Sequence, residues 1–161
     1  MNERDQRFMS EALRLAEIAA VADEVPVGAV VVRGETIMGL GSNANIGQSD
    51  PTAHAEILAL REAGRYDNNY RLPGAELFVT LEPCPMCYAA LVQARISRLV
   101  YGANDPKGGY TLFYGESGLA QFNHQIEVVS GTMEATCRSV MQAFFKAKRE
   151  RGKRKWLKGT L

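Results

Sequence analysis

Residues 76–101 read ELFVTLEPCPMCYAALVQARISRLVY, and this stretch decides the expected fold. The apolar run at 76–80 predicts a strand, the segment 85–95 that opens on proline predicts a helix, and 98–101 predicts a second strand. A strand, a helix and a strand in succession favour an α/β fold with at least one pair of parallel strands.

The residues before this stretch extend the same pattern. Residues 5–22 predict an amphipathic helix, because apolar side chains recur at spacings of three and four. Residues 27–32 form a continuous apolar run, typical of a strand covered on both faces, and 36–40 return as the second strand of a hairpin. Residues 52–63 predict another helix, which we expect to stop at Gly64.

The residues after it complete the prediction. We expect a long loop after residue 101, then a strand at 126–129 and a helix that runs from Met133 into the C-terminal segment. The sequence therefore predicts a three-layer α/β/α sandwich around a central mixed sheet of about five strands. We expect residues 1–150 to form a single domain and 151–161 to form a basic C-terminal tail.

Composition excludes several classes of protein. The chain has 161 residues, of which 46% are hydrophobic and 23% charged, so it is neither disordered nor collagen-like. No apolar stretch approaches 18 residues and no apolar leader occupies residues 1–20, so we expect no membrane contact and a cytoplasmic location. In a reducing compartment, Cys-x-x-Cys is more often metal-binding or redox-active than a structural disulfide.

Charge is distributed unevenly along the chain. Residues 146–161 hold eight basic residues and one acidic residue, a net charge of +7, whereas residues 1–145 carry −6. This asymmetry has two interpretations, a solvated C-terminal end or a surface for a polyanionic partner.

Two short motifs, His54-Ala-Glu56 and Cys84-Pro-Met-Cys87, each lie where a helix should begin. Cysteines three residues apart across a helix start can direct both sulfurs at one point, and the positive end of the helix dipole favours their thiolate form. One imidazole and two thiolates form a three-ligand Zn²⁺ site whose fourth position stays open for water. Fe²⁺ is the alternative ion for such a set.

Glu56 distinguishes a reactive site from a structural one. Two positions after His54, it is poorly placed as a fourth ligand, but it can exchange protons with a water at the metal. H-x-E followed by P-C-x-x-C is a pattern typical of zinc deaminases. The alternatives are a dithiol redox pair, or a structural zinc site that recruits His124 or Cys137. Cys137 has the helical spacing of a core residue, and His124 fits a loop residue or a phosphate contact.

With these motifs the chain resembles the cytidine deaminase superfamily and, within it, the bacterial tRNA-specific adenosine deaminases. The resemblance runs from the first predicted helix to about Arg149. It rests on the segments 24–29 (EVPVGA), 50–56 (DPTAHAE), 70–72 (YRL), 79–84 (VTLEPC), 101–103 (YGA), 105–107 (DPK) and 144–145 (FF), and on Asn43, Arg95-Ile96 and Asn123-His124.

The resemblance implies hydrolytic deamination of adenosine to inosine at the wobble position of a tRNA anticodon, by a homodimer with one Zn²⁺ in each subunit. It implies that zinc is bound by His54, Cys84 and Cys87, with Glu56 as the proton shuttle. It also implies substrate contacts from Asn43, Asp105, Lys107 and Phe145. A tRNA substrate would explain the basic residues that follow Phe145. We therefore expect RNA contacts from Lys146, Lys148, Arg149 and Arg151.

One stretch departs from the family pattern. Residues 108–122 contain Tyr110, Phe113, Tyr114 and Phe122 where the family usually shows small residues. These aromatic rings could stack on a base, or they could fill the core or a dimer contact. The alternative functions are therefore a deaminase of a free base, nucleoside or pterin, and a non-catalytic RNA-binding zinc protein. Glu56 argues against the second, because a structural metal site does not need it.

Overall fold

The computed structural model describes residues 2–157 and 159. A five-stranded mixed sheet lies at its centre in the order β2-β1-β3-β4-β5. Strand β1 pairs antiparallel with β2 and with β3, whereas β3–β4 and β4–β5 are parallel pairs. The elements are α1 (Glu3–Val21), β1 (Gly28–Arg33), β2 (Thr36–Ser42), α2 (Ala55–Asp67), β3 (Glu76–Leu81), α3 (Pro85–Gln93), β4 (Arg98–Ala103), α4 (Tyr110–Ala120), β5 (Glu127–Ser130) and α5 (Glu134–Leu157).

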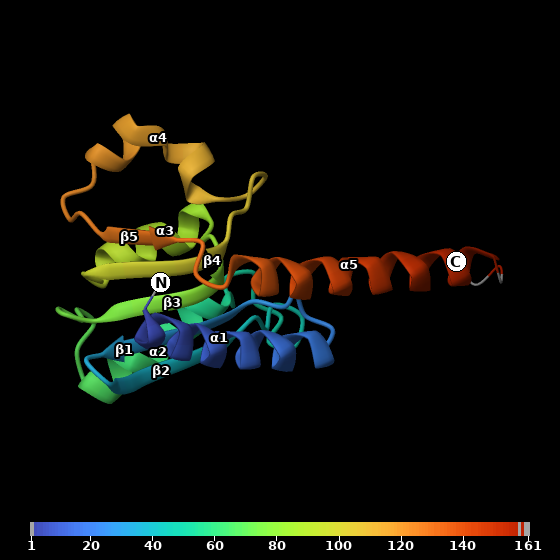
Figure 1. Cartoon of the computed structure of the whole chain (residues 1–161), viewed down its shortest axis with the longest axis horizontal. Helices are drawn as coiled ribbons and strands as arrows, with labels where there is room; N and C mark the ends of the chain where they lie inside the picture. Colours follow the sequence, from blue (N-terminus) through green and yellow to red (C-terminus); the bar gives the residue numbers. More distant parts are fainter. Residues whose placement is uncertain (1, 158, 160–161) are drawn as a thin grey trace.

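Successive side chains of the buried strands pack alternately into two hydrophobic cores, one on each face of the sheet. Val30, Phe78 and Val100 pack with residues of α1 and with Cys137 of α5. Their neighbours in sequence pack on the opposite face with α2 and α3, for example Val31 and Leu77. Figure 1 shows α1 on one side of the sheet and α2 and α3 on the other. The predicted three-layer α/β/α sandwich is confirmed, as is the expectation that β1 is covered on both faces.

Close approach of backbone to backbone fixes where α2 lies on the sheet. A Cβ atom at Gly39 would lie 2.2 Å from the carbonyl oxygen of Ala59, and one at Gly41 would lie 2.0 Å from that of Ala55. Only glycine allows this contact, so β2 supports the first two turns of α2 directly. The start of α2, which carries His54 and Glu56, is therefore held rigidly against the sheet.

The structure corrects two expectations about helices. Helix α2 does not stop at Gly64; it continues to Asp67, and Asn68 caps it in the left-handed conformation with φ of 49°. A single glycine is tolerated inside a helix when the next turn still packs, and asparagine can take the capping conformation. The segment expected as a loop after residue 101 contains helix α4, which is interrupted at Gly115 with φ of 62°. Its two short halves leave no sustained helical period in the sequence.

Helix α5 begins against the sheet and extends away from it (Figure 1). It runs without a break across residue 150, so the division between 150 and 151 stays a prediction. Lys158 and residues 160–161 of the predicted tail lie outside the described residues. Among the helices of the described part, none has both the length and the apolar character needed to cross a membrane.

Candidate metal centre and active site

Two helix starts bring the three predicted metal ligands together. His54 is the N-cap residue of α2, Cys84 is the N-cap residue of α3, and Cys87 lies in the first turn of α3. The Nδ1 atom of His54 lies 3.6 Å from the Sγ atom of Cys84 and 3.4 Å from that of Cys87. All three donor atoms lie within 4.8 Å of one another.

These distances fit a metal ion of the size and preference of Zn²⁺. With Zn–S bonds near 2.3 Å and Zn–N bonds near 2.05 Å, a tetrahedral site separates sulfur from nitrogen by about 3.6 Å. The donor set itself, one imidazole and two thiolates, is one that binds zinc in catalytic sites. Positive ends of two helix dipoles also face this point, which stabilises anionic ligands.

The protonation equilibria of the two cysteines are coupled. A hydrogen bond from Cys87 lowers the pKa of Cys84 to about 4, and a second contribution comes from His54. The same contact with Cys84 raises the pKa of Cys87, and burial adds to this effect. A hydrogen bond to Cys84 raises the pKa of His54 above its usual value. The cluster thus holds a thiolate at Cys84 near neutral pH, which is the form that a metal requires.

Glu56 is buried beside the three ligands, at 4% exposure. Burial disfavours its charged form and raises the pKa of its carboxyl group to about 7. A carboxyl group that takes up and releases a proton near neutral pH is suited to general acid and base catalysis.

A cavity of about 200 Å³ opens onto this group. Two predicted substrate residues line it, Asn43 after β2 and Asp105 after β4. The side chain of Asn43 is also structural, because its oxygen accepts a hydrogen bond from the backbone N–H of Ala55 at 2.7 Å. The full lining is Val25, Val27, Asn43, Asn45, His54, Glu56, Leu81, Glu82, Cys84 and Asp105.

A second cavity of about 380 Å³ adjoins the first. The two share Val25, Leu81 and Asp105 as lining residues, so they are direct neighbours. Phe145 of α5 lines this second part, together with Ala103, Asn104, Arg138, Met141 and Gln142.

The remaining predicted residues do not reach the cavities. Lys107 is exposed, and its backbone N–H donates to Asp105. Lys146, Lys148 and Arg149 lie exposed on α5. Arg151, also on α5, pairs with Asp23 at 2.9 Å beyond the end of α1.

The surroundings of Cys137 and His124 bear on the alternatives raised for them. Cys137 is buried in the core, 1% exposed, as its helical spacing predicted. His124 lies near β4, where its Nε2 atom is 2.7 Å from the carbonyl oxygen of Ile96. Neither residue belongs to the metal-ligand cluster.

Most of the atypical aromatic residues pack rather than line the site. Tyr110 stacks on Tyr88 with ring centroids 4.1 Å apart, and Tyr114 and Phe122 also pack against Tyr88. The hydroxyl of Tyr114 donates to the carbonyl oxygen of Pro85. Phe113 is the exception, since its side chain is exposed.

Sequence reasoning missed several residues of the cavity. Asn45 and Glu82 line it, and neither was assigned a role. For Glu82 a signal existed, because it stands in the segment 79–84 immediately before the Pro83-Cys84 turn.

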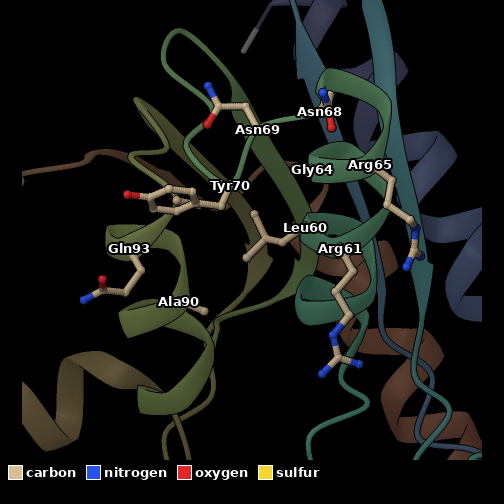
Figure 2. Close-up of a pocket in the computed structure, with 10 residues that line it drawn as sticks. Leu60, Arg61, Gly64, Arg65, Asn68, Asn69, Tyr70, Ala90 and Gln93 are labelled. Carbon is tan, nitrogen blue, oxygen red and sulfur yellow. The ribbon is translucent and has the colours of Figure 1, made fainter.

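A larger hollow of about 790 Å³ lies elsewhere, between α2 and α3 (Figure 2). Arg61 and Arg65 extend from α2 on one side of it, while Tyr70 and Gln93 lie on the other. No histidine, cysteine or carboxylate occurs among its lining residues, so we place the chemistry in the smaller cavity. Those residues are Leu60, Arg61, Gly64, Arg65, Asn68, Asn69, Tyr70, Ala90, Gln93 and Ala94.

Comparison with known proteins identifies the relatives of this chain. A family model described as MafB19-like deaminase matches residues 3–149. The chain is 45% identical to a tRNA-specific adenosine deaminase of Haemophilus influenzae, an alignment that covers 94% of this chain and 89% of that protein. It is 42% identical to a protein of the same name from Bacillus subtilis, with coverage of 93% and 94%.

Solved structures agree with this relationship. One comes from a study of A-to-I editing by tRNA:A34 deaminases at the wobble position of transfer RNA; it matches with a TM-score of 0.78 and 43% identity, over 83% of this chain and 98% of that chain. A guanine deaminase from Nitrosomonas europaea matches with a TM-score of 0.74 at 23% identity, over 86% of this chain and 83% of that chain. The second likeness shows a shared fold.

Proposed function

Since the chain belongs to the MafB19-like deaminases and to the family of tRNA-specific adenosine deaminases, we propose that it hydrolyses adenosine to inosine at the wobble position of a tRNA anticodon. The observation that carries the proposal is the convergence of His54, Cys84 and Cys87 beside the buried carboxyl group of Glu56 in one cavity.

We propose His54, Cys84 and Cys87 as the ligands of a Zn²⁺ ion. Their donor atoms have the spacing of a tetrahedral site and the chemistry of a catalytic zinc set. When bound there, the ion would lower the pKa of a water molecule and so supply a nucleophile near neutral pH.

Glu56 is the proposed proton shuttle. Its carboxylate takes a proton from the attacking water as the oxygen adds to C6 of adenine. The protonated group then donates to the ring nitrogen N1, and a proton passes through the same carboxyl to the amino group, which leaves as ammonia. Adenosine and water give inosine and ammonia. A pKa of about 7 suits a group that must act both as base and as acid.

The form of the hollow supports a polynucleotide substrate. A part of about 200 Å³ next to Glu56 receives the target base, which must leave its stack to reach the metal site. The adjoining part continues to Phe145 on α5, and Lys146, Lys148, Arg149 and Arg151 follow on that helix. We propose that these basic side chains contact phosphates of the anticodon arm.

The walls of the cavity supply the remaining contacts. We propose that Asn43 and Asp105, which line the cavity, bind the target nucleotide, and that the exposed Lys107 contacts the substrate outside it. The amide nitrogen of Asn43 is its donor group, since its oxygen is occupied by the Ala55 N–H. We also propose a homodimer in the cytoplasm, as the family resemblance implies; sedimentation of the purified protein measures the first point.

The test is direct. Purified protein is incubated with unmodified tRNA, which is then sequenced for adenosine read as guanosine in the anticodon. A panel of free guanine, cytosine, adenosine and pterins is assayed in parallel for ammonia release. Editing of tRNA without turnover of the panel supports the proposal. Turnover of a free base alone would favour the small-substrate alternative, and zinc binding without any turnover would favour a non-catalytic zinc protein.

Glu56→Gln tests the assigned role. It should reduce turnover by at least about 100-fold while the zinc content stays at one per chain. An active, metal-loaded variant would contradict the role of Glu56.

A further inference from the structure

Glu82 is a buried carboxylate whose hydrogen-bond donors come from the segment between β4 and the first turn of α4. It follows β3 and is 4% exposed. One carboxylate oxygen accepts the backbone N–H of Asp105 at 2.9 Å. The other accepts both the backbone N–H and the hydroxyl of Thr111, at 3.2 Å and 2.5 Å. The carboxylate therefore binds both ends of the segment 105–111.

Backbone hydrogen bonds fasten the same two segments together. The N–H of Glu82 donates to Ala103 at 2.8 Å, and the N–H of Tyr110 donates to Pro83 at 2.9 Å. Asp105 in turn accepts the backbone N–H groups of Lys107 and Gly108 with its own carboxylate. The loop that forms one wall of the catalytic cavity is thus wrapped around the Glu82 side chain.

This arrangement makes the buried carboxylate of Glu82 dependent on the segment 105–111 for its hydrogen bonds. A buried carboxylate is strongly destabilising unless it is paired or hydrogen-bonded. Within the described residues, no lysine, arginine or histidine forms a salt bridge with Glu82. Donors from Asp105 and Thr111 replace a cation, so the loop cannot move without leaving the charge unsatisfied.

Gly109 shows how closely the loop approaches the carboxylate. A Cβ atom at this position would lie 2.3 Å from the carboxyl carbon of Glu82. The backbone itself is ordinary, with φ of −72°, so it is the contact and not the conformation that requires glycine here.

We propose that Glu82 is a positioning residue for deamination. Its carboxylate sets the distance between Asp105, which lines the cavity, and Cys84, a proposed metal ligand. Cys84 lies two residues after Glu82, and both Cys84 and Asp105 line the cavity. The Glu82 side chain therefore connects Cys84, a proposed metal ligand, with Asp105, a residue proposed to contact the substrate. The inference rests on the proposed function, because it concerns how that substrate is oriented.

Glu82→Gln removes the charge and keeps the shape. A glutamine offers one oxygen and one NH₂ group, so either the Asp105 N–H or the Thr111 N–H loses its acceptor. We expect kcat for tRNA to fall about 100-fold, the effect of a misplacement of about 1 Å, with KM changed much less. Assays run well below the melting temperature and normalised to zinc-loaded protein separate this effect from unfolding.

Three further variants complete the test. Gly109→Ala pushes the carboxylate away without removing its charge, so it should lower kcat to a similar degree. The double variant should be no worse than the poorer single variant, because both changes break one contact. Glu116→Gln, the same chemical change at an exposed position on α4, is the matched control and should leave kcat unchanged.

Hydrogen exchange gives a readout that does not depend on catalysis. Amides of residues 103–112 should exchange faster in Glu82→Gln and in Gly109→Ala than in the unchanged protein. Unaltered exchange, or an unaltered kcat in both variants of an enzyme that edits tRNA, would overturn the role of Glu82. If the unchanged protein fails to edit tRNA while its loop exchange still depends on Glu82, the proposed function fails instead.

Discussion

The side-chain oxygen of Asn43 accepts a hydrogen bond from the backbone N–H of Ala55 at 2.7 Å, and this bond ties the loop after β2 to the first turn of α2. His54, the N-cap residue of α2, makes no capping bond with its own side chain. Asn43 thus caps the N-terminus of α2 in place of His54, and the His54 imidazole faces the two cysteines instead. The helix start that carries a proposed metal ligand and the proposed proton shuttle thus depends on Asn43, twelve positions before its partner Ala55.

Asn43→Ala and Asn43→Asp separate capping from substrate contact. Alanine removes the acceptor and should reduce stability by about 1 kcal/mol, which lowers the melting temperature by about 2–4 °C. Aspartate keeps the acceptor near the positive helix end, so its melting temperature should match that of the unchanged protein. Both lose the amide NH₂ group, and both should reduce kcat/KM for tRNA. Full activity of the aspartate variant would limit Asn43 to capping.

Metal removal should expose one class of cysteine and spare another. Cys84 is partly exposed, whereas Cys137 is buried and burial raises its pKa to about 11. Treatment with a chelator should lower the melting temperature, because bound metal stabilises the folded state. It should also allow an alkylating reagent to modify Cys84 but not Cys137 in the folded protein. Peptide mass spectrometry reads the result, and added Zn²⁺ should protect Cys84. Equal modification with and without metal would contradict the ligand assignment.

Acid stability should depend on Asp5. Its carboxylate accepts two hydrogen bonds from Arg98, at 3.0 Å and 2.7 Å, and this pairing lowers the pKa of Asp5 below its ordinary value of 3.8. Its folded pKa thus lies below its unfolded pKa, so the stabilisation is present above about pH 4 and is lost as pH falls through the folded value.

The variant Asp5→Asn tests this sign. At neutral pH it should reduce the free energy of unfolding by about 3 kcal/mol, since it leaves part of a buried ion pair without its partner. Near pH 2 the difference should shrink, because the stabilisation from the charged form of Asp5 is lost as its carboxylate becomes protonated. Denaturant titrations at several pH values measure this convergence. Arg98 opens β4, whereas the site lies after the other end of that strand, so zinc content should be unaffected.

Local pattern was enough to predict most of the fold. Continuous apolar runs predicted β1 and β3, and the short spacing between His54 and Glu56 was the basis for proposing a ligand role for the first and a proton-shuttle role for the second. Such patterns can be recognised without a structure because each depends on residues that are neighbours in sequence.

Long-range contacts set what the sequence could not predict. Helix α4 was missed because its stability comes from Tyr110 and Tyr114 packing on α3, and Gly115 interrupts its period. The role of Glu82 depends on donors 23 and 29 residues away, which no spacing rule connects. The same applies to Asn43, whose partner in α2 became evident only in three dimensions.

The basic face of α5 should determine how strongly tRNA binding depends on salt. Lys148 and Arg149 are exposed on this helix. The double variant Lys148→Gln/Arg149→Gln should raise KM for tRNA several-fold near 100 mM salt. For each phosphate-binding side chain that the variant removes, the slope of log affinity against log salt concentration should become shallower by about 0.7–0.9. Titrations at three or more salt concentrations give this slope. Arg7→Gln removes a charge at the far end of the sheet, where it pairs with Glu35, and should change neither quantity.

Asp23 provides the opposite test, because it holds a basic side chain of α5 that we assign to RNA. Its carboxylate pairs with Arg151 at 2.9 Å, and both side chains are about half exposed, so the pair itself contributes little to stability. Asp23→Asn should therefore leave the melting temperature unchanged while it frees Arg151 for a phosphate. We expect a lower KM for tRNA and a steeper salt dependence than in the unchanged protein. Adding Arg151→Gln should cancel the gain, and an identical gain in the double variant would mean that Arg151 does not contact the RNA.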